Sequence, residues 1–261
     1  MYNENLDQMS FARWNHGFNN LFRAELSNWF KKKAFLARLL LFCAFTNGMA
    51  LLLWLQAPGV EAEAILVFGI FAGLVSSIGI AVITQESIAG EIKSGAASWI
   101  LSKPITRESY ILAKWLANSI GAIVTMIIGP ASVFYALYFL FTGELLHLMM
   151  FPAVITVLTI NVLFFLSLTL MMGSFQRNTS VVIGIPVAFY VAEQILCNFS
   201  SFLVVIFPWG LTNPLADGSP SIVVSFITGS QPFSMLPVIV TSLCIIVFLF
   251  LTVKIMQKQE I

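Results

Sequence analysis

The chain has 261 residues, of which 59% are hydrophobic and only 10% charged, and its formal net charge is +1. Soluble domains carry about 25% charged residues, so this balance excludes an ordinary soluble fold. The near-neutral charge excludes the strong positive field that nucleic-acid binding requires, and we expect no nucleic acid among the partners. The cysteines Cys43, Cys197 and Cys244 lie within or at the end of apolar segments, which argues against a disulfide framework.

Residues 18–33 predict an amphipathic helix before the first long apolar stretch. Six large apolar residues recur at the three-and-four spacing of one helical face: Phe18, Leu21, Phe22, Leu26, Trp29 and Phe30. The segment is too short and too polar to cross a membrane, so we expect it to lie in the cytoplasmic interface. Glu25 interrupts the apolar face, because it follows Phe18 by seven positions. Either Glu25 faces protein and pairs with a base of the next cytoplasmic segment, residues 85–114, with Lys93, Lys103 or Arg107 as the candidates, or the helix tilts and Glu25 reaches the headgroups.

Six later stretches are long enough to cross a membrane, since a helix needs about 20 apolar residues to do so. They are Leu36–Leu55, Ala64–Thr84, Ile111–Phe141, Phe151–Phe175, Val181–Cys197 and Ser234–Met256. The third is too long for a perpendicular crossing, and we expect Pro130 to kink it, as Pro186 kinks the fifth. The expected fold class is therefore an all-α integral membrane protein with six transmembrane helices in a single domain over residues 1–261.

The segment 85–110, between the second and third spans, predicts a short helix with exposed apolar groups. Ser94-Gly95 breaks the preceding helix, and Ala96–Leu101 is apolar enough to form the next one. Thr106 is placed to cap the third span. An exposed apolar helix needs a partner, and the alternative is that it folds back on the membrane surface.

The segment 198–233, before the last span, is both apolar and rich in proline. It contains FLVVIFPWGL and IVVSFI, together with Pro208, Pro214, Pro220 and Pro232. It is too broken to span and too apolar for a solvated loop. Two short re-entrant helices among the span ends would explain it, and an additional pair of full spans is the alternative.

Every basic residue falls in alternate joints between the spans. The joints before the first span and after the second, fourth and sixth hold all thirteen: Arg13, Arg23, Lys31, Lys32, Lys33, Arg38, Lys93, Lys103, Arg107, Lys114, Arg177, Lys254 and Lys258. The remaining joints hold Glu61, Glu63, Glu144 and Asp217 instead. Cytoplasmic loops concentrate Lys and Arg, so we expect both termini in the cytoplasm and an even number of spans.

The sequence has no motif for catalysis or for binding a nucleotide. A GxxxxGK[ST] loop, a GxSxG elbow and an HExxH helix are all absent, and the chain has only two histidines. We therefore expect no enzyme activity, no metal site and no cofactor bound by the chain itself.

Polar residues within the spans are candidates for a substrate route: Glu193, Asn47, Asn118 and Asn161. A carboxyl in the outer half of the fifth span points to function, unless that helix ends early and Glu193 sits at the interface. Asparagines in spans more often form hydrogen bonds between helices.

The segment after the second span resembles that of ABC-2 type permeases. In that family the span runs into a Glu-rich stretch, a small-residue turn, a run of the form LLS-x-P-[IV]-[ST]-R and a downstream lysine. The matching residues here are Glu86 and Glu91, Gly95, ILSKPITR from Ile100 to Arg107, and Lys114. Most members have Gly-Thr where this chain has Gly95-Ala96. The layout of a flat helix, six spans and a broken apolar segment before the last span is also similar.

The resemblance implies the membrane half of an ATP-driven transporter, in most relatives an exporter, in a bacterial inner or plasma membrane. Two permeases, identical or paralogous, would meet around a central route, each bound by a separate ABC ATPase that holds ATP and Mg²⁺. The short helix becomes a cytoplasmic coupling helix. The residues expected to couple to the ATPase are then Glu25, Glu86, Glu91, Trp99, Ile100, Leu101, Lys103, Pro104 and Arg107.

Two other classes of protein remain as alternatives. An ion-coupled secondary transporter or channel would need buried ionisable groups and usually an internal repeat; we find one such group at most and no repeat. A structural or assembly protein of the membrane would tolerate loss of coupling to an ATPase, which a transport assay would detect.

Overall fold

The computed structural model describes residues 17–57, 59–103, 105–215, 218–232 and 234–258. Arg13, Pro104 and Asp217 lie outside these ranges. The described residues form helices and connecting segments, with no strand among them. Six of the helices are long and apolar enough to cross a membrane. The all-helical fold class and the six spans predicted from the sequence are therefore confirmed.

The first described element is a helix over residues 17–29, the N-terminal helix, which ends four residues earlier than expected. α2 (Lys32–Gln56) and α3 (Glu61–Thr84) are the first two spans. Two short helices follow, α4 (Ala89–Ser94) and α5 (Ala96–Leu101). The structure contains no membrane, so the interfacial position of the N-terminal helix stays a prediction.

The third span is a continuous helical segment from Arg107 to Thr142. It comprises α6 (Arg107–Ala122), the π-helical η1 (Ile123–Ile128) and α7 (Gly129–Thr142). Pro130 has no N–H to donate to the preceding turn, so the regular ladder cannot continue through it. The irregularity expected at Pro130 is a π-helical turn directly before it. Asn47 of α2 donates from Nδ2 to the Pro130 carbonyl at 3.2 Å.

The remaining spans are α8 (Phe151–Phe175, preceded by the short η2, Leu148–Met150), α9 (Thr179–Phe199) and α13 (Leu236–Lys258). α8 is the centre of the bundle and contacts α3, α6, α9, α12 and α13. In its most apolar window 67% of residues are buried, against 22% in α2 and in α13. The outer helices α2 and α13 thus keep most of their apolar surface for lipid or for a partner.

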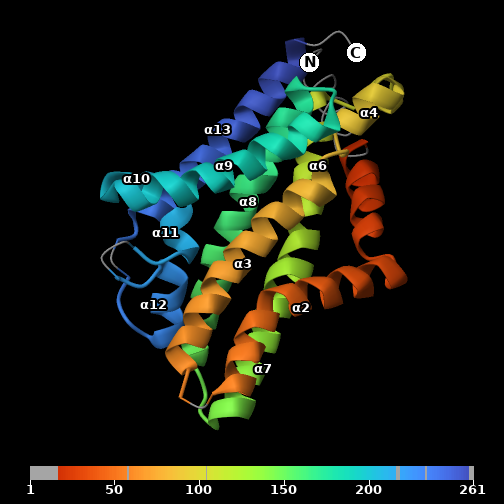
Figure 1. The fold of residues 1–261 in the computed structure, drawn as a ribbon. Coiled ribbons are helices and arrows are strands. Elements are labelled where there is room, and N and C mark those ends of the chain that lie inside the picture. The colour runs from red at the N-terminus through yellow and green to blue at the C-terminus, as the bar shows by residue number, and fades with distance from the viewer. Residues whose placement is uncertain (1–16, 58, 104, 216–217, 233, 259–261) are drawn as a thin grey trace, which may run out of the picture.

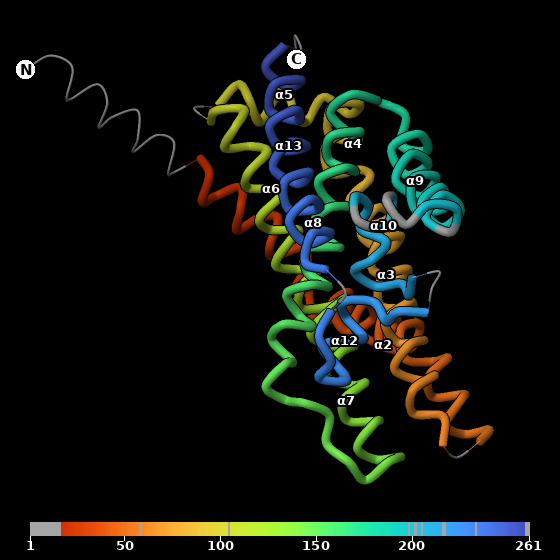
Figure 2. Tube along the Cα trace, turned by 90° about the vertical axis from the view of Figure 1, so that its left-hand side faces the viewer, coloured from red at the N-terminus to blue at the C-terminus, as the bar shows by residue number. Residues whose placement is uncertain are grey.

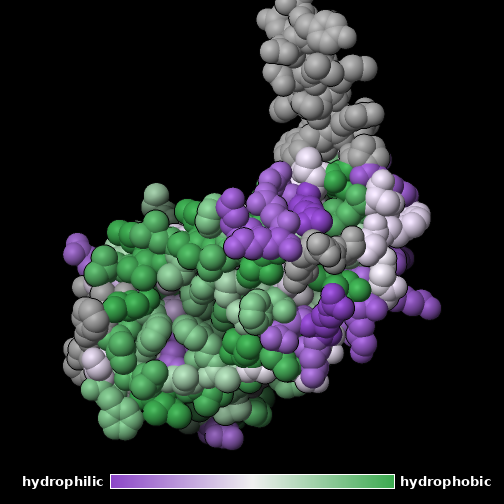
Figure 3. Space-filling model, turned by 90° about the horizontal axis from the view of Figure 1, so that it is seen from above, coloured by the Kyte–Doolittle hydropathy of each residue, from purple (hydrophilic) through white to green (hydrophobic). Residues whose placement is uncertain are grey.

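The two ends of the bundle differ in charge. Figure 1 shows α4, the start of α6 and the end of α13 together at one end, which carries Lys93, Lys103, Arg107, Lys114 and Lys258 and is named the basic end. The start of α3 and the end of α7 meet at the other, acidic end, with Glu61, Glu63 and Glu144. Viewed onto the basic end, hydrophilic residues gather on one side and hydrophobic residues cover the other (Figure 3).

The segment between α9 and α13 occupies the part of the bundle that α9 does not reach. Figure 2 shows α9 ending well short of the level where α3 begins and α7 ends. Three short helices then lead toward the acidic end, where the sequence predicted two: α10 (Ser201–Ile206), α11 (Trp209–Thr212) and α12 (Ile222–Thr228). A Cβ at Gly73 of α3 would lie 2.3 Å from Thr212 Oγ1, so only glycine lets α11 approach this closely.

Candidate functional site at the basic end

Local backbone signals position the short helices of the basic end. Gly95 has φ +78° and stands between α4 and α5, which confirms the predicted break at Ser94-Gly95. A left-handed conformation costs glycine little, so the chain turns sharply there. Thr106 caps α6, because its hydroxyl accepts from the Ser109 N–H at 3.1 Å, as predicted. α5 is therefore held as a separate helix between α4 and the third span.

α5 presents one large aromatic side chain to its surroundings. Trp99 is 64% exposed, and Lys103 Nζ lies 3.5 Å from the centre of its ring. Ile100 and Leu101 are half-buried and pack against the core of the bundle, while Ala97 is fully buried. Of the three apolar residues expected to form a docking surface, Trp99 thus points outward, and the other two also anchor α5 to the spans.

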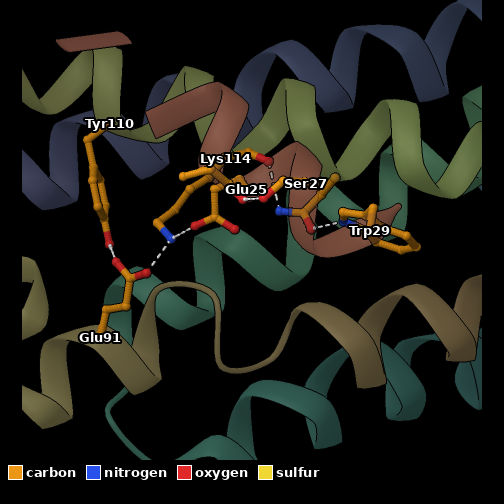
Figure 4. A network of polar contacts seen from close by, with 8 residues as sticks. Glu25, Ser27, Trp29, Glu91, Tyr110 and Lys114 are labelled. Atoms are coloured by element: carbon orange, nitrogen blue, oxygen red, sulfur yellow. Dashed lines mark hydrogen bonds and ion pairs between the residues drawn. The ribbon is translucent and has the colours of Figure 1, made fainter. Parts of the chain in front are cut away.

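A buried lysine joins the elements behind α5. Lys114 of α6 is 0% exposed, and its ammonium contacts Glu91 Oε1 of α4 at 2.6 Å and Glu25 Oε1 of the N-terminal helix. Tyr110, one turn before Lys114, donates from its hydroxyl to Glu91 Oε2 at 2.6 Å. Figure 4 shows these four side chains converging from three helices. We name Glu25, Glu91, Tyr110 and Lys114 the lysine network.

The lysine network pairs one buried ammonium with two carboxylates. An ammonium has three donors and no acceptor, and two carboxylates supply acceptors for two of them. A charge without solvent is tolerated only when it is paired and hydrogen-bonded, so each member depends on the others. The prediction that Glu25 faces protein and pairs with a base of the next cytoplasmic segment, residues 85–114, is confirmed, but the three candidate partners named, Lys93, Lys103 and Arg107, are wrong, since the partner is Lys114. The reason is that the N-terminal helix packs along α6, a register that the sequence does not specify.

A second contact fastens the N-terminal helix to α6 further along. Trp29 is 3% exposed and donates from Nε1 to Asn118 Oδ1 at 2.8 Å. Asn118 in turn donates to the Lys114 carbonyl at 2.7 Å. The indole lies over Gly121, where an added Cβ would come within 2.1 Å of the ring. The N-terminal helix is therefore placed by a charge contact and an aromatic contact on the same helix.

Arg107 connects the basic end to the last span. Its Nη1 donates to the Met256 carbonyl and, at 2.8 Å, to the Gln257 carbonyl at the end of α13. The last carbonyls of a helix have no partner within it and carry partial negative charge, so a guanidinium stabilises them. Gln257 also donates to Glu108 Oε1 at 2.8 Å.

The other predicted coupling residues that the structure describes lie at the basic end without entering the lysine network. Glu86 is exposed in the turn between α3 and α4, and Lys103 contacts only the Trp99 ring in the described part of the chain. Sequence patterns predicted no role for Tyr110 or for the indole nitrogen of Trp29, and Lys114 entered only as one of the basic residues and as the lysine of the family motif. The signal for Lys114 and Tyr110 was their four-residue spacing, which puts both on one face of α6.

The candidate route residues are not brought together. Asn47 donates to the Cys43 and Pro130 carbonyls, Asn118 to the Lys114 carbonyl, and Asn161 to Ser77 Oγ at 3.0 Å. These three are engaged in contacts that hold helices together, although the route assignment itself stays a prediction. Glu193 lies elsewhere, on α9, and is 2% exposed.

The structure has six apolar spans, and its charges are segregated to the two ends of the bundle. An ion pair with the buried Lys114 holds α4 at the basic end. These are the features of a multi-pass membrane protein. Residues 19–243 match the model of the family described as ABC-2 family transporter protein, so the chain belongs to that family. A comparison with curated proteins found no match. Members of this family are membrane components of transporters and are not themselves catalytic, which agrees with the expected lack of enzyme activity.

Proposed function

We propose that this protein is the permease of an ATP-driven exporter in the cell membrane and that a separate ABC ATPase docks on α5. The observation that carries this proposal is Trp99, a large aromatic side chain that is 64% exposed although the helix bearing it is otherwise anchored to the core. Exposed aromatic residues of this kind are typical interface anchors. The chain has no GxxxxGK[ST] motif for ATP, and in this proposal the ATPase partner supplies the energy.

The proposed orientation places the basic end in the cytoplasm. Its support is the restriction of all thirteen Lys and Arg residues to alternate joints. Both termini would then be cytoplasmic, and α5 would face the compartment that holds ATP and Mg²⁺. The proposed assembly contains two permeases, identical or paralogous, and two ATPases, with lipid around the outer spans.

Movement of α5 can reach three parts of the bundle through contacts already described. The lysine network joins α4 and α6 to the N-terminal helix, which leads directly into α2. Arg107 joins the start of α6 to the end of α13. A displacement of α5 by the ATPase would therefore act on the first, third and last spans together, which is the coupling that we propose.

The test is co-purification of the tagged permease from its native membrane, with any bound ABC ATPase identified and quantified by mass spectrometry. Trp99→Ala is expected to lower recovery of the ATPase by at least about tenfold, since anchors at interfaces contribute about 2 kcal/mol or more. Leu145→Ala, which removes a side chain 69% exposed at the acidic end, is the matched control and should leave recovery unchanged. Full recovery with Trp99→Ala combined with Leu101→Ala, in a permease that still inserts, would contradict docking on α5.

Function as an ion-coupled carrier is the competing proposal, and the family match does not favour it. The two are separated by reconstituting the permease alone and with its ATPase. Transport that needs the ATPase and ATP supports the proposal, whereas transport by the permease alone, driven by an ion gradient, contradicts it.

A further inference from the structure

One buried carboxyl takes no part in the contacts at the basic end. Glu193 of α9 is 2% exposed, and its Oε2 atom has no hydrogen-bond partner among the described residues. An ionised carboxylate that is buried without a partner is among the most costly groups a protein can hold, and a neutral one costs far less. The protonation state in which Glu193 is buried therefore has to be explained.

The immediate surroundings of Glu193 are weakly polar and uncharged. Tyr190 and Cys197 lie one helical turn to either side of it on α9, and both are buried. The Tyr190 hydroxyl lies near the side chain of Asn213, just after α11, but forms no well-aligned hydrogen bond within the described residues. Asn213 is itself 2% exposed and donates to Thr212 Oγ1 at 3.2 Å. These groups can form hydrogen bonds with a protonated carboxyl, but they carry no positive charge that would neutralise a carboxylate.

No cation is available from the helices that pack most closely against α9, which are α3, α4, α8, α10 and α11. α8, α10 and α11 contain no Asp, Glu, Lys, Arg or His, and α9 contains none besides Glu193. The ionisable residues of α3 are Glu61 and Glu63, in its first turn at the acidic end, which α9 does not reach (Figure 2).

α4 carries Glu91 and Lys93, but it meets α9 near the basic end. Gly173 of α8 packs there between Ala89 and Val182. Val182 precedes Glu193 by eleven positions, which is roughly 16 Å along a helix. Lys93 is therefore too far along the bundle to pair with Glu193.

We propose that Glu193 is a proton-binding site within the bundle. It is a neutral carboxylic acid in this closed conformation. When α9 and α11 separate and water reaches the side chain, its O–H bond breaks, the proton passes to water, and the electron pair stays on the carboxylate. When α9 and α11 pack together again, the carboxylate of Glu193 takes up a proton from water. This site adds a protonation step to the cycle of the permease, and it does not depend on which partner supplies energy.

The test is labelling of the purified permease with dicyclohexylcarbodiimide, an apolar reagent that modifies protonated carboxyls. Mass spectrometry of the peptide with residues 181–199 should show the adduct on Glu193 at pH 6, less at pH 9, and none in Glu193→Gln. Glu25 and Glu91, which are paired with Lys114, are the internal controls and should stay unmodified. An unmodified Glu193 at pH 6, with its peptide recovered, would overturn the proposal. Equal modification by a water-soluble carbodiimide would do so too, because it would show an open, hydrated side chain.

Thermal unfolding provides a second readout that does not involve labelling. Glutamine closely matches a neutral carboxylic acid, so Glu193→Gln should keep the wild-type Tm at pH 4, where glutamate is largely protonated in the unfolded chain as well, since its pKa there is about 4.3. At pH 9 Glu193→Gln should unfold at a higher temperature than wild type, because unfolding then lets the wild-type Glu193 ionise in water, which stabilises the unfolded state. A lower Tm at both pH values would mean that Glu193 is an ionised partner in a salt bridge or cation site, and the proposal would be wrong.

Discussion

The ammonium of Lys114 lies 2.6 Å from Glu91 Oε1, so α6 is tied to α4, the helix directly before α5. The same ammonium holds Glu25, which lies 89 residues earlier in the chain. One fully buried side chain thus fixes the relative positions of three helices at the basic end.

Lys114→Met should destabilise the protein by less than the roughly 3–5 kcal/mol typical of a fully buried pair, because it leaves two carboxylates without a cation but their side chains are 18% and 25% exposed. We expect a clearly lower apparent Tm, measured by intrinsic fluorescence in detergent. Adding Glu25→Gln and Glu91→Gln to Lys114→Met should recover most of the loss, since no charge then remains unpaired. A wild-type Tm for Lys114→Met would show that water reaches the network.

Glu25→Gln alone should cost less than Lys114→Met, since Lys114 keeps its contact with Glu91. Exchanging the charges with Glu25→Lys and Lys114→Glu should not restore stability, because the new carboxylate would face Glu91. A double-mutant cycle on the Tm of these variants measures the coupling. Full rescue by the exchange would mean that Glu91 is not part of the network.

Gly121→Ala should displace the N-terminal helix, because the added Cβ would lie 2.1 Å from the Trp29 ring. Overpacking of this kind typically costs about 1–3 kcal/mol, which a thermal unfolding assay can resolve. Gly48→Ala is the matched control, since that glycine is also helical and has no atom within 4 Å of the added Cβ. Trp29→Leu, combined with Gly121→Ala, should relieve the clash. Equal Tm values for Gly121→Ala and Gly48→Ala would contradict the packing of Trp29.

Arg107→Gln should loosen the last turn of α13, since it removes the guanidinium that binds two terminal carbonyls. Hydrogen bonds to charged groups contribute about 1.5–3 kcal/mol, so amide exchange near Met256 should accelerate by roughly tenfold or more. The measurement is hydrogen exchange with mass spectrometry on the peptide that ends α13. Lys103→Gln removes a nearby charge that contacts only Trp99 in the described structure, and it should leave that exchange rate unchanged.

Ser102→Cys, in a chain whose native cysteines are replaced by alanine, should react with a membrane-impermeant thiol reagent only in inverted vesicles. Leu145→Cys, at the acidic end, should react only from outside intact cells. The reason is the segregation of basic residues, which places the basic end in the cytoplasm. Reaction of both cysteines from the same side would refute the six-span topology, and reversed labelling would refute the orientation.

Much of the architecture follows from local sequence. Apolar length gave the six spans, since a helix must satisfy its own backbone in lipid and needs a fixed length to cross it. Gly95 and Thr106 marked the ends of α4, α5 and α6 because each acts on its immediate neighbours. The exposed face of α5 that carries Trp99 could also be predicted, since α5 is one short helix between the local signals at Gly95 and Thr106.

The contacts between distant segments were decided only by the tertiary structure. The sequence left open whether Glu25 pairs with a cation or reaches the headgroups, and only the packing of the N-terminal helix along α6 selects Lys114 as its partner. The number of short helices before α13, and the packing of α11 against Gly73, depend likewise on α9 ending early. Helix formation is set by residues a few positions apart, whereas the register of one helix on another is set by side-chain shape and charge across the whole bundle. That register places Glu25 beside Lys114 and leaves Glu193 without a lysine partner among the described residues.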